Sequence, residues 1–221
     1  MTPFSARIHA AFDFAAIHHR KQMRKDPDIE IPYIAHLFGV AYILASHDLS
    51  EDTVVAGVLH DFLEDIVEKK RRPKLAIEFR TVFGEHVYQL VRLVTHRKKD
   101  EHGKDVPWEV RTAEYVSRLS SPSTPNEAKA ISCADKIHNI ESLLIALDRN
   151  TANPNRMWNK LKKTPKEQLE KFRALHDGIS THWQHPLVAD LASMIQKLEK
   201  ALPYERPKKI GLIERLISKG A

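Results

Sequence analysis

The sequence predicts an all-α protein. Apolar residues recur at spacings of three and four in most segments, which is the period of an amphipathic helix. Glycine accounts for only 7 of the 221 residues, and no two segments show the alternating pattern and tight turn of a β-hairpin. The length suits one substantial domain of about 150 residues with an extension. We therefore expect a helical domain over 1–150, further helices over 151–202 packing on it, and a basic tail over 203–221.

Three helices are expected in the first third of the chain. The first covers about 5–23 and precedes a loop, KDPDIEIP, in which two prolines break the helical pattern. The second carries its apolar residues between Ile34 and Leu44. Ser50 is suited to cap the third, because a serine hydroxyl accepts a hydrogen bond from the free N–H groups of a first turn. The apolar pattern of this third helix continues through Phe62.

Polar segments separate the helices expected in the middle of the chain. Apolar residues predict a helix over 75–83 and another over 87–94. The segment 96–107 is polar, so we expect a loop there, and a helix over 110–119 follows it.

Two capping boxes predict the starts of later helices. The stretches TPNE at 124–127 and TPKE at 164–167 each combine a threonine, a proline at the first helical position and a glutamate three residues after the threonine. A last helix follows Pro186, with apolar residues up to Leu202.

The chain carries a formal net charge of +6 with histidine counted as neutral. Such a charge suits an anionic partner, whether phosphate, nucleic acid or acidic lipid. The basic clusters are short, and no zinc-finger spacing or RNA-binding aromatic motif accompanies them, so a nucleic-acid partner is disfavoured. A solvated basic surface is the simpler explanation of the charge alone.

The cytoplasm is the location that the sequence favours. Cys133 is the only cysteine, which excludes an internal disulfide framework. The N-terminal residues lack the apolar run of a signal peptide, and no window reaches the roughly 18 apolar residues of a transmembrane helix. We expect no membrane partner, and the helices over 165–202 leave a homo-oligomer open.

The segment GVLHDFLEDI, at 57–66, places four ionisable side chains in apolar surroundings: His60, Asp61, Glu64 and Asp65. Burying an unpaired charge is costly, so we expect a compensating group, and a metal ion is the obvious candidate. On one continuous helix, His60 and Glu64 lie four residues apart, as do Asp61 and Asp65, so all four crowd neighbouring faces. Imidazole nitrogen and carboxylate oxygen together suit Mn²⁺, Fe²⁺ or Zn²⁺.

Two more ionisable residues lie in apolar runs of other predicted helices. His36 is part of IPYIAHLFGVA, and Asp135 is part of ISCADKIHNI. A single residue of this kind is more often a core or capping residue than a metal ligand. The order of a histidine, a His-Asp pair and a later aspartate, each in a predicted helix, favours a shared site instead.

This order resembles that of the HD-domain metal-dependent phosphohydrolases. HDFLED resembles the HDxxED signature of the hydrolase domain of RelA/SpoT proteins and of the metazoan SpoT homolog, which degrade guanosine tetra- and pentaphosphate alarmones. The stretches HHRKQMRKDPDIEIPYIAH and CADKIHNIESL resemble two further signatures of that family. Together the matches span residues 10–147. The resemblance implies an HD-domain helical bundle.

The resemblance also implies a metal site and an acid/base pair. It gives Glu64 and Asp65 the task of moving protons during hydrolysis. It implies one divalent ion, most often Mn²⁺, held by His36, His60, Asp61 and Asp135. Two neutral imidazoles and two carboxylates balance the charge of such an ion.

A polyphosphate substrate needs cations and hydrogen-bond donors around it. Arginine suits such a site because it stacks on a base and also bonds to phosphate. The residues expected to contact the substrate are Arg24, Lys25, Lys136, Asn139 and Ser142.

The function that the resemblance implies is hydrolysis of the ribose 3′-diphosphate of ppGpp or pppGpp, giving pyrophosphate and GDP or GTP. Glu141 stands where the signature commonly has a basic residue, which leaves a phosphatase acting on another nucleotide, such as NADPH, open. A non-catalytic, metal-dependent nucleotide sensor is the alternative from another class. A nucleic-acid phosphodiesterase is a third, and the flanking signatures disfavour it.

Overall fold

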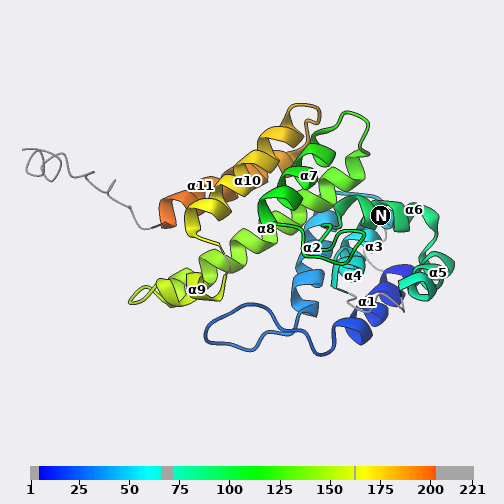
Figure 1. Ribbon diagram of the computed structural model, residues 1–221, viewed down its shortest axis with the longest axis horizontal. Helices are drawn as coiled ribbons and strands as arrows, with labels where there is room; N and C mark the ends of the chain where they lie inside the picture. Colours follow the sequence, from blue (N-terminus) through cyan, green and yellow to red (C-terminus); the bar gives the residue numbers. More distant parts are fainter. Residues whose placement is uncertain (1–4, 66–71, 162, 203–221) are drawn as a thin grey trace, which may run out of the picture.

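The computed structural model describes residues 5–65, 72–161 and 163–202, and the regular elements of these residues are all helices (Figure 1). Their β-type pairing is limited to two isolated bridges, Met23 with Pro32 and Lys99 with Asp105. The prediction of an all-α fold is therefore confirmed. The helices are α1 (Ala6–His19), α2 (Ile34–Ser46), α3 (Glu51–Leu59), α4 (Phe62–Asp65), α5 (Arg72–Phe83), α6 (Glu85–Val94), α7 (Trp108–Ser120), α8 (Asn126–Arg149), α9 (Asn155–Lys160), α10 (Pro165–Ser180) and α11 (Pro186–Ala201).

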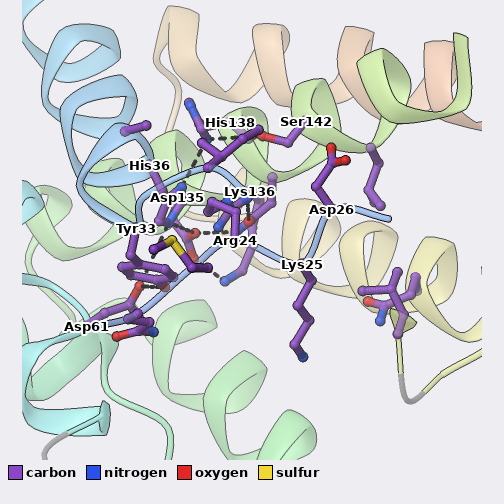
Figure 2. A pocket seen from close by; sticks show the side chains of 18 of the residues that line it. Arg24, Lys25, Asp26, Tyr33, His36, Asp61, Asp135, Lys136, His138 and Ser142 are labelled. Carbon is purple, nitrogen blue, oxygen red and sulfur yellow. Dashed lines mark hydrogen bonds and ion pairs between the residues drawn. The ribbon is translucent and has the colours of Figure 1, made fainter. Parts of the chain in front are cut away.

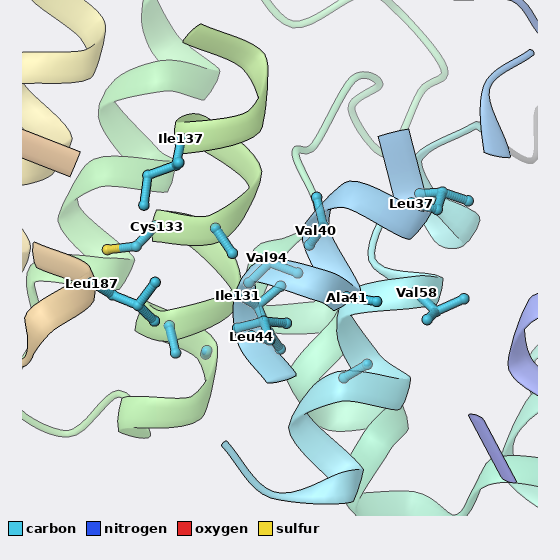
Figure 3. Close-up of a cluster of buried hydrophobic side chains, with 14 of the residues drawn as sticks. Leu37, Val40, Ala41, Leu44, Val58, Val94, Ile131, Cys133, Ile137 and Leu187 are labelled. Carbon is cyan, nitrogen blue, oxygen red and sulfur yellow. The ribbon is translucent and has the colours of Figure 1, made fainter. Parts of the chain in front are cut away.

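Helix α8 forms the centre of the molecule. Every residue from Ala128 to Ile137 is buried, and a helix that is buried on all sides must be enclosed by other elements. Helices α2, α3 and α6 pack against α8, and so does α11. Figure 3 shows apolar side chains from these five helices meeting in one core. Asp135 and Lys136 therefore lie inside the molecule, and their charges need partners there.

The third predicted helix is interrupted where the His-Asp pair lies, which corrects the expectation of one continuous helix. Helix α3 ends at Leu59, His60 and Asp61 form a turn, and α4 begins at Phe62. The Nδ1 atom of His60 bonds to the carbonyl oxygen of Gly57 at 2.8 Å. That carbonyl is the one that the N–H of Asp61 would use in a continuing helix. After this break, Nε2 of His60 lies 3.8 Å from Oδ1 of Asp135 on α8, and Oδ2 of Asp61 lies 3.8 Å from Nε2 of His36 on α2.

Helix α1 ends at His19, earlier than predicted. The N–H of Gln22 bonds back to the His19 carbonyl at 2.8 Å, and the N–H of Arg24 bonds to the Ile31 carbonyl at 2.8 Å. The residues after α1 thus leave the helix and form a loop that closes on itself before α2.

One of the two predicted capping boxes is present. The Thr164 hydroxyl accepts from the N–H of Glu167 at 3.2 Å, and the Glu167 carboxylate accepts from the N–H of Thr164 at 2.8 Å. The box predicted at 124–127 is wrong, because the Thr124 hydroxyl donates to the Arg118 carbonyl at 2.6 Å instead. Pro125 takes the capping position of α8 and has no side-chain oxygen to offer.

The C-terminal helices pack on the rest of the chain, at the opposite end from α1 and α5 (Figure 1). Helix α10 packs against α7, and α11 runs along α8. The short helix α9 was not predicted. The boundary at 150 stays a prediction, and the tail over 203–221 lies outside the described residues. Among the described helices, none combines the length and the apolar character that crossing a membrane requires.

Candidate active site

The four predicted metal ligands meet at one point inside the bundle. The ligand atoms of His36, His60 and Asp135 all lie within 4.8 Å of one another. The Oδ2 atom of Asp61 lies 3.0 Å from Nε2 of His60 and 3.8 Å from Nε2 of His36. Helix α2 supplies the first histidine, the turn after α3 supplies the His-Asp pair, and α8 supplies Asp135. Figure 2 shows His36, Asp61 and Asp135 on these separate elements around the cluster.

Hydrogen bonds behind the two histidines direct their Nε2 atoms into the cluster. His60 uses Nδ1 to bond to Gly57, and His36 uses Nδ1 to contact Nδ1 of His138 at 2.9 Å. In the described part of the chain, Nε2 of His60 is buried and makes no hydrogen bond of good geometry, although Oδ2 of Asp61 lies 3.0 Å away. A buried polar atom without a partner costs free energy, and a metal ion at this place would supply the partner. The donor set thus fits a divalent ion.

The two carboxylates also have hydrogen-bond donors around them. Asp61 accepts a hydrogen bond from the hydroxyl of Tyr33. Asp135 accepts from the ammonium of Lys136 and from the amide of Asn139. Partners of this kind orient metal ligands and tune their affinity.

The electrostatics of the cluster favour a bound cation. Burial lowers the pKa of His36, which keeps this ring neutral. Burial also acts to lower the pKa of His60, but the charges of Asp61 and Asp135 outweigh it and raise this pKa to about 9. Burial acts to raise the pKa of both aspartates, and the neighbouring positive charges, chiefly those of His60 and Lys136, hold it well below the usual range. A centre with two ionised carboxylates suits a divalent ion, which competes with the proton on His60.

Glu64 lies beside the cluster and is fixed at both oxygen atoms. Its Oε2 accepts from the N–H of His96 at 3.1 Å, and its Oε1 lies 3.2 Å from Nζ of Lys98. Burial and then the charge of Asp61 raise the pKa of Glu64, while Lys98 opposes the rise. Asp65 is the last residue of α4, and its side chain lies outside the described part of the structure.

A pocket of about 570 Å³ opens in front of the cluster. It is lined by the two histidines, Asp61, Asp135 and Glu64. The residues predicted to contact the substrate all line the same pocket: Arg24, Lys25, Lys136, Asn139 and Ser142. The structure therefore brings these predicted residues together, and their roles stay predictions.

The loop between α1 and α2 is tied to the far end of α8. Asp26 pairs with Arg149, and Asp28 accepts from the Asn150 amide at 2.6 Å. Arg24 donates to Oδ1 of Asn139 at 2.9 Å, so it directly contacts α8, the helix that carries Asp135. In Figure 2, Lys25 extends from the same loop, apart from His36, Asp61 and Asp135. The loop thus holds its cations over the pocket.

The sequence interpretation missed several residues that contact the cluster. His138 lies one turn after Asp135 on α8, and Tyr33 comes three residues before His36. This spacing places each of them on the same face as a predicted ligand, so the sequence could have indicated both. His96 and Lys98 belong to the segment that we predicted as a polar loop. Their contact with Glu64 has no local signal, because it joins residues more than 30 positions apart.

Comparison with known proteins identifies the family. Residues 11–161 match the family model described as HD domain. The chain belongs to the HD-domain family. HD domains are metal-dependent, and in this HD domain His36, His60 and Asp135 form the group that could hold the metal.

Curated relatives of this HD domain include hydrolases of a guanosine bis(diphosphate) and proteins named GTP pyrophosphokinase. The chain is 36% identical over 141 residues to guanosine-3′,5′-bis(diphosphate) 3′-pyrophosphohydrolase MESH1 of Mus musculus. The aligned residues cover 63% of this chain and 70% of the mouse protein. The Homo sapiens protein of the same name is 37% identical over the same shares.

Solved structures confirm the HD-domain fold. A structure described as a metazoan ortholog of SpoT that hydrolyzes ppGpp and plays a role in starvation responses matches with a TM-score of 0.67 and 25% identity, over 91% of this chain and 100% of that one. The structure of lmo0812 from Listeria monocytogenes matches with a TM-score of 0.62 and 25% identity, over 75% of this chain and 99% of that one.

Proposed function

We propose that this HD domain is an enzyme that hydrolyses the ribose 3′-diphosphate of ppGpp or pppGpp and releases pyrophosphate with GDP or GTP. The observation that carries the proposal is the meeting of His36, His60, Asp61 and Asp135 in a pocket that also holds Glu64. The relationship to the MESH1 hydrolases, at 36% identity to the mouse protein, supports the choice of substrate.

A bound divalent ion, Mn²⁺ in our proposal, would act as a Lewis acid that lowers the pKa of water near the scissile phosphate. His36, His60, Asp61 and Asp135 would hold this ion. Tyr33 and His138 would keep one aspartate and one histidine in place, as their hydrogen bonds indicate.

Glu64 is the base of the proposed reaction. The attacking water gives its proton to the Glu64 carboxylate as its oxygen bonds to the 3′-phosphorus. The bond from this phosphorus to the ribose 3′ oxygen breaks, and that oxygen receives a proton, which leaves a 3′ hydroxyl and free pyrophosphate. The raised pKa of Glu64 suits a group that must accept and then return a proton near neutral pH. Asp65 is the second candidate for this proton transfer.

The cations around the pocket suit a substrate with several phosphates. Arg24 and Lys25 reach it from the loop, and Lys136 reaches it from α8 beside Asp135. Burial acts to lower the pKa of Lys136, but the charge of Asp135 outweighs it and raises this pKa, so the lysine is charged in the pocket. Asn139 and Ser142 add polar groups for the ribose or the base. We also propose that the protein acts in the cytoplasm, the location predicted from the sequence.

Product analysis tests the proposal. The purified protein with Mn²⁺ is offered ppGpp, pppGpp and NADPH in parallel, and the products are separated by anion-exchange chromatography. Release of pyrophosphate with GDP or GTP, absent in Asp61→Ala, is the expected result. Phosphate released from NADPH, with ppGpp and pppGpp uncleaved, would contradict the proposed substrate and leave the site assignment intact. No turnover of any of the three by metal-loaded protein would favour the nucleotide sensor.

A further inference from the structure

The pocket has a second wall, which the HD signatures do not supply. Leu161, at the end of α9, and Gln168, Lys171 and Phe172 of α10 line the same cavity as the metal cluster. The match to the HD family ends at residue 161. Helix α10 therefore adds to the pocket side chains that lie outside the family match.

Lys171 carries an ammonium group that is partly shielded from water. The residue is only partly exposed, and the next inward-facing residues of its helix, Phe172 and Leu175, are buried. Within the described residues, no hydrogen bond or ion pair involves its Nζ. An ammonium that is shielded from water costs free energy unless an anion accompanies it. An anionic ligand of the pocket would supply that missing partner.

The charge of Lys171 acts on the catalytic groups. Burial and then the charge of Lys136 lower the pKa of Lys171 to about 8, while Asp135 and Glu64 act in the opposite direction. Burial and the charges of Lys136 and Lys171 in turn lower the pKa of His96 to about 2. Lys171 therefore lies within electrostatic reach of both the metal ligands and Glu64.

Neighbouring cations are already engaged with protein carboxylates. Lys136 is bonded to Asp135, and Lys98 lies 3.2 Å from Glu64. Each of them neutralises a charge that belongs to the protein. Lys171 has no such contact among the described residues, so its ammonium is available to a ligand.

We propose that Lys171 binds the diphosphate of the nucleotide substrate from helix α10, an inference that rests on the proposed function. The diphosphate would lie near the four predicted metal ligands and would also meet this ammonium. A charge-assisted hydrogen bond in a shielded pocket is shorter and stronger than a neutral one. In this role Lys171 is a substrate-binding residue, and helix α10 becomes part of the active site.

Binding of inorganic pyrophosphate, measured by isothermal titration calorimetry on Mn²⁺-loaded protein, tests this inference. Lys171→Met removes the charge and keeps the length of the side chain, and Lys171→Arg keeps the charge. Lys166→Met is the matched control, because Lys166 is on the same helix with 76% of its side chain exposed. We expect Lys171→Met to weaken pyrophosphate binding by about 10- to 100-fold. Lys171→Arg should retain most of the affinity, and Lys166→Met should match the unaltered protein.

Kinetics and thermal melting separate binding from folding. For ppGpp, Lys171→Met should lower kcat/KM by about the same 10- to 100-fold factor as the binding constant. Its melting temperature should equal or exceed that of the unaltered protein, because an unpaired, shielded charge is removed. If Lys171→Met folds poorly, the arginine variant decides: lost pyrophosphate binding in a stable Lys171→Arg protein overturns the inference, and retained binding supports it.

Two further outcomes distinguish this inference from the proposed function. Unchanged pyrophosphate affinity in Lys171→Met would overturn the role of Lys171, even if ppGpp is cleaved. Pyrophosphate binding that depends on Lys171, in a protein that leaves ppGpp and pppGpp uncleaved, would overturn the hydrolase proposal and support an anion site at Lys171.

Discussion

His36 and His138 face each other through their Nδ1 atoms at 2.9 Å. Only one of these two atoms can carry the proton in that contact. His36 needs a lone pair on Nε2 to bind a metal, so its proton belongs on Nδ1, and Nδ1 of His36 donates a hydrogen bond to Nδ1 of His138. Burial holds the pKa of His138 at about 4, which keeps the acceptor neutral. His138 would thus fix the tautomer of His36, one of the predicted metal ligands.

Replacing His138 with Ala should weaken Mn²⁺ binding by about 10- to 100-fold, because partners behind a ligand contribute that much to metal affinity. A metal titration followed by calorimetry measures the effect. His182→Ala is the control, since His182 is an exposed histidine outside the pocket. Equal metal affinity in both variants would show that His36 keeps its orientation without His138.

Gly39 of α2 packs against the same ring, and its replacement should disturb the site from behind. A Cβ at this position would lie 2.0 Å from Cδ2 of His138. We expect Gly39→Ala to lower the free energy of unfolding by about 1–3 kcal/mol through overpacking, and to weaken Mn²⁺ binding as well. Denaturant unfolding and a metal titration measure the two effects.

The matched control for Gly39 is Gly178, where a Cβ would lie 1.8 Å from Oγ of Ser120. That contact joins α10 to α7 away from the pocket. Gly178→Ala should therefore reduce stability and leave Mn²⁺ affinity unchanged. A comparable loss of metal affinity in both variants would mean that the effect of Gly39 is general loosening of the fold.

Glu64→Gln should lower kcat by about 10²- to 10⁴-fold, the usual contribution of a general base, with little change in Mn²⁺ affinity. The amide can still accept from the N–H of His96, but it cannot take a proton from water. Steady-state kinetics with ppGpp and a metal titration check this pair of results. Glu114→Gln, which removes the surface partner of Arg97, is the control. Near-normal turnover in Glu64→Gln would contradict the role of Glu64 and indicate that Asp65 is the general base.

Removal of the metal should destabilise the protein. A ligand at 100 times its dissociation constant stabilises the folded state by about 2.7 kcal/mol. Melting in saturating Mn²⁺ and after treatment with a chelator should therefore differ by several degrees. Asp61→Ala should show no such difference and no metal-dependent turnover. A persistent Mn²⁺ effect on the melting of Asp61→Ala would contradict the ligand assignment.

The metal-free protein should lose stability as the pH rises from about 6.5 to about 9. The pKa of His60 is raised from 6.5 to about 9 in the fold, where burial opposes protonation and the charges of Asp61 and Asp135 outweigh it. A raised pKa stabilises the folded state fully below the unfolded value, and this contribution disappears as the pH passes through the folded value. Thermal melts across this range, with His60→Gln as the variant that lacks the group, measure it. A flat profile in the unaltered protein would contradict the coupling.

The sequence was sufficient for the residues whose signal is local. The helical period located most helices, and Thr164 and Glu167 marked the start of α10 because a capping box involves only neighbours in the chain. The same local logic was wrong at 124–127, where Thr124 bonds to the Arg118 carbonyl at 2.6 Å. A four-residue capping-box pattern gives no information about an acceptor elsewhere in the chain, such as the Arg118 carbonyl.

The residue types and order of the metal cluster were determined by the sequence itself, through His36, the His60-Asp61 pair and Asp135. The tertiary structure decided which side chains contact these residues and Glu64: His138 contacts His36, and Lys98 lies 3.2 Å from Glu64. The break after Leu59 and the approach of α10 to the pocket were decided there as well. The physical reason is that hydrogen bonds and charges act through space within a few ångströms. Periodicity along the chain records which face of a helix is buried, but not which side chain of another helix meets it.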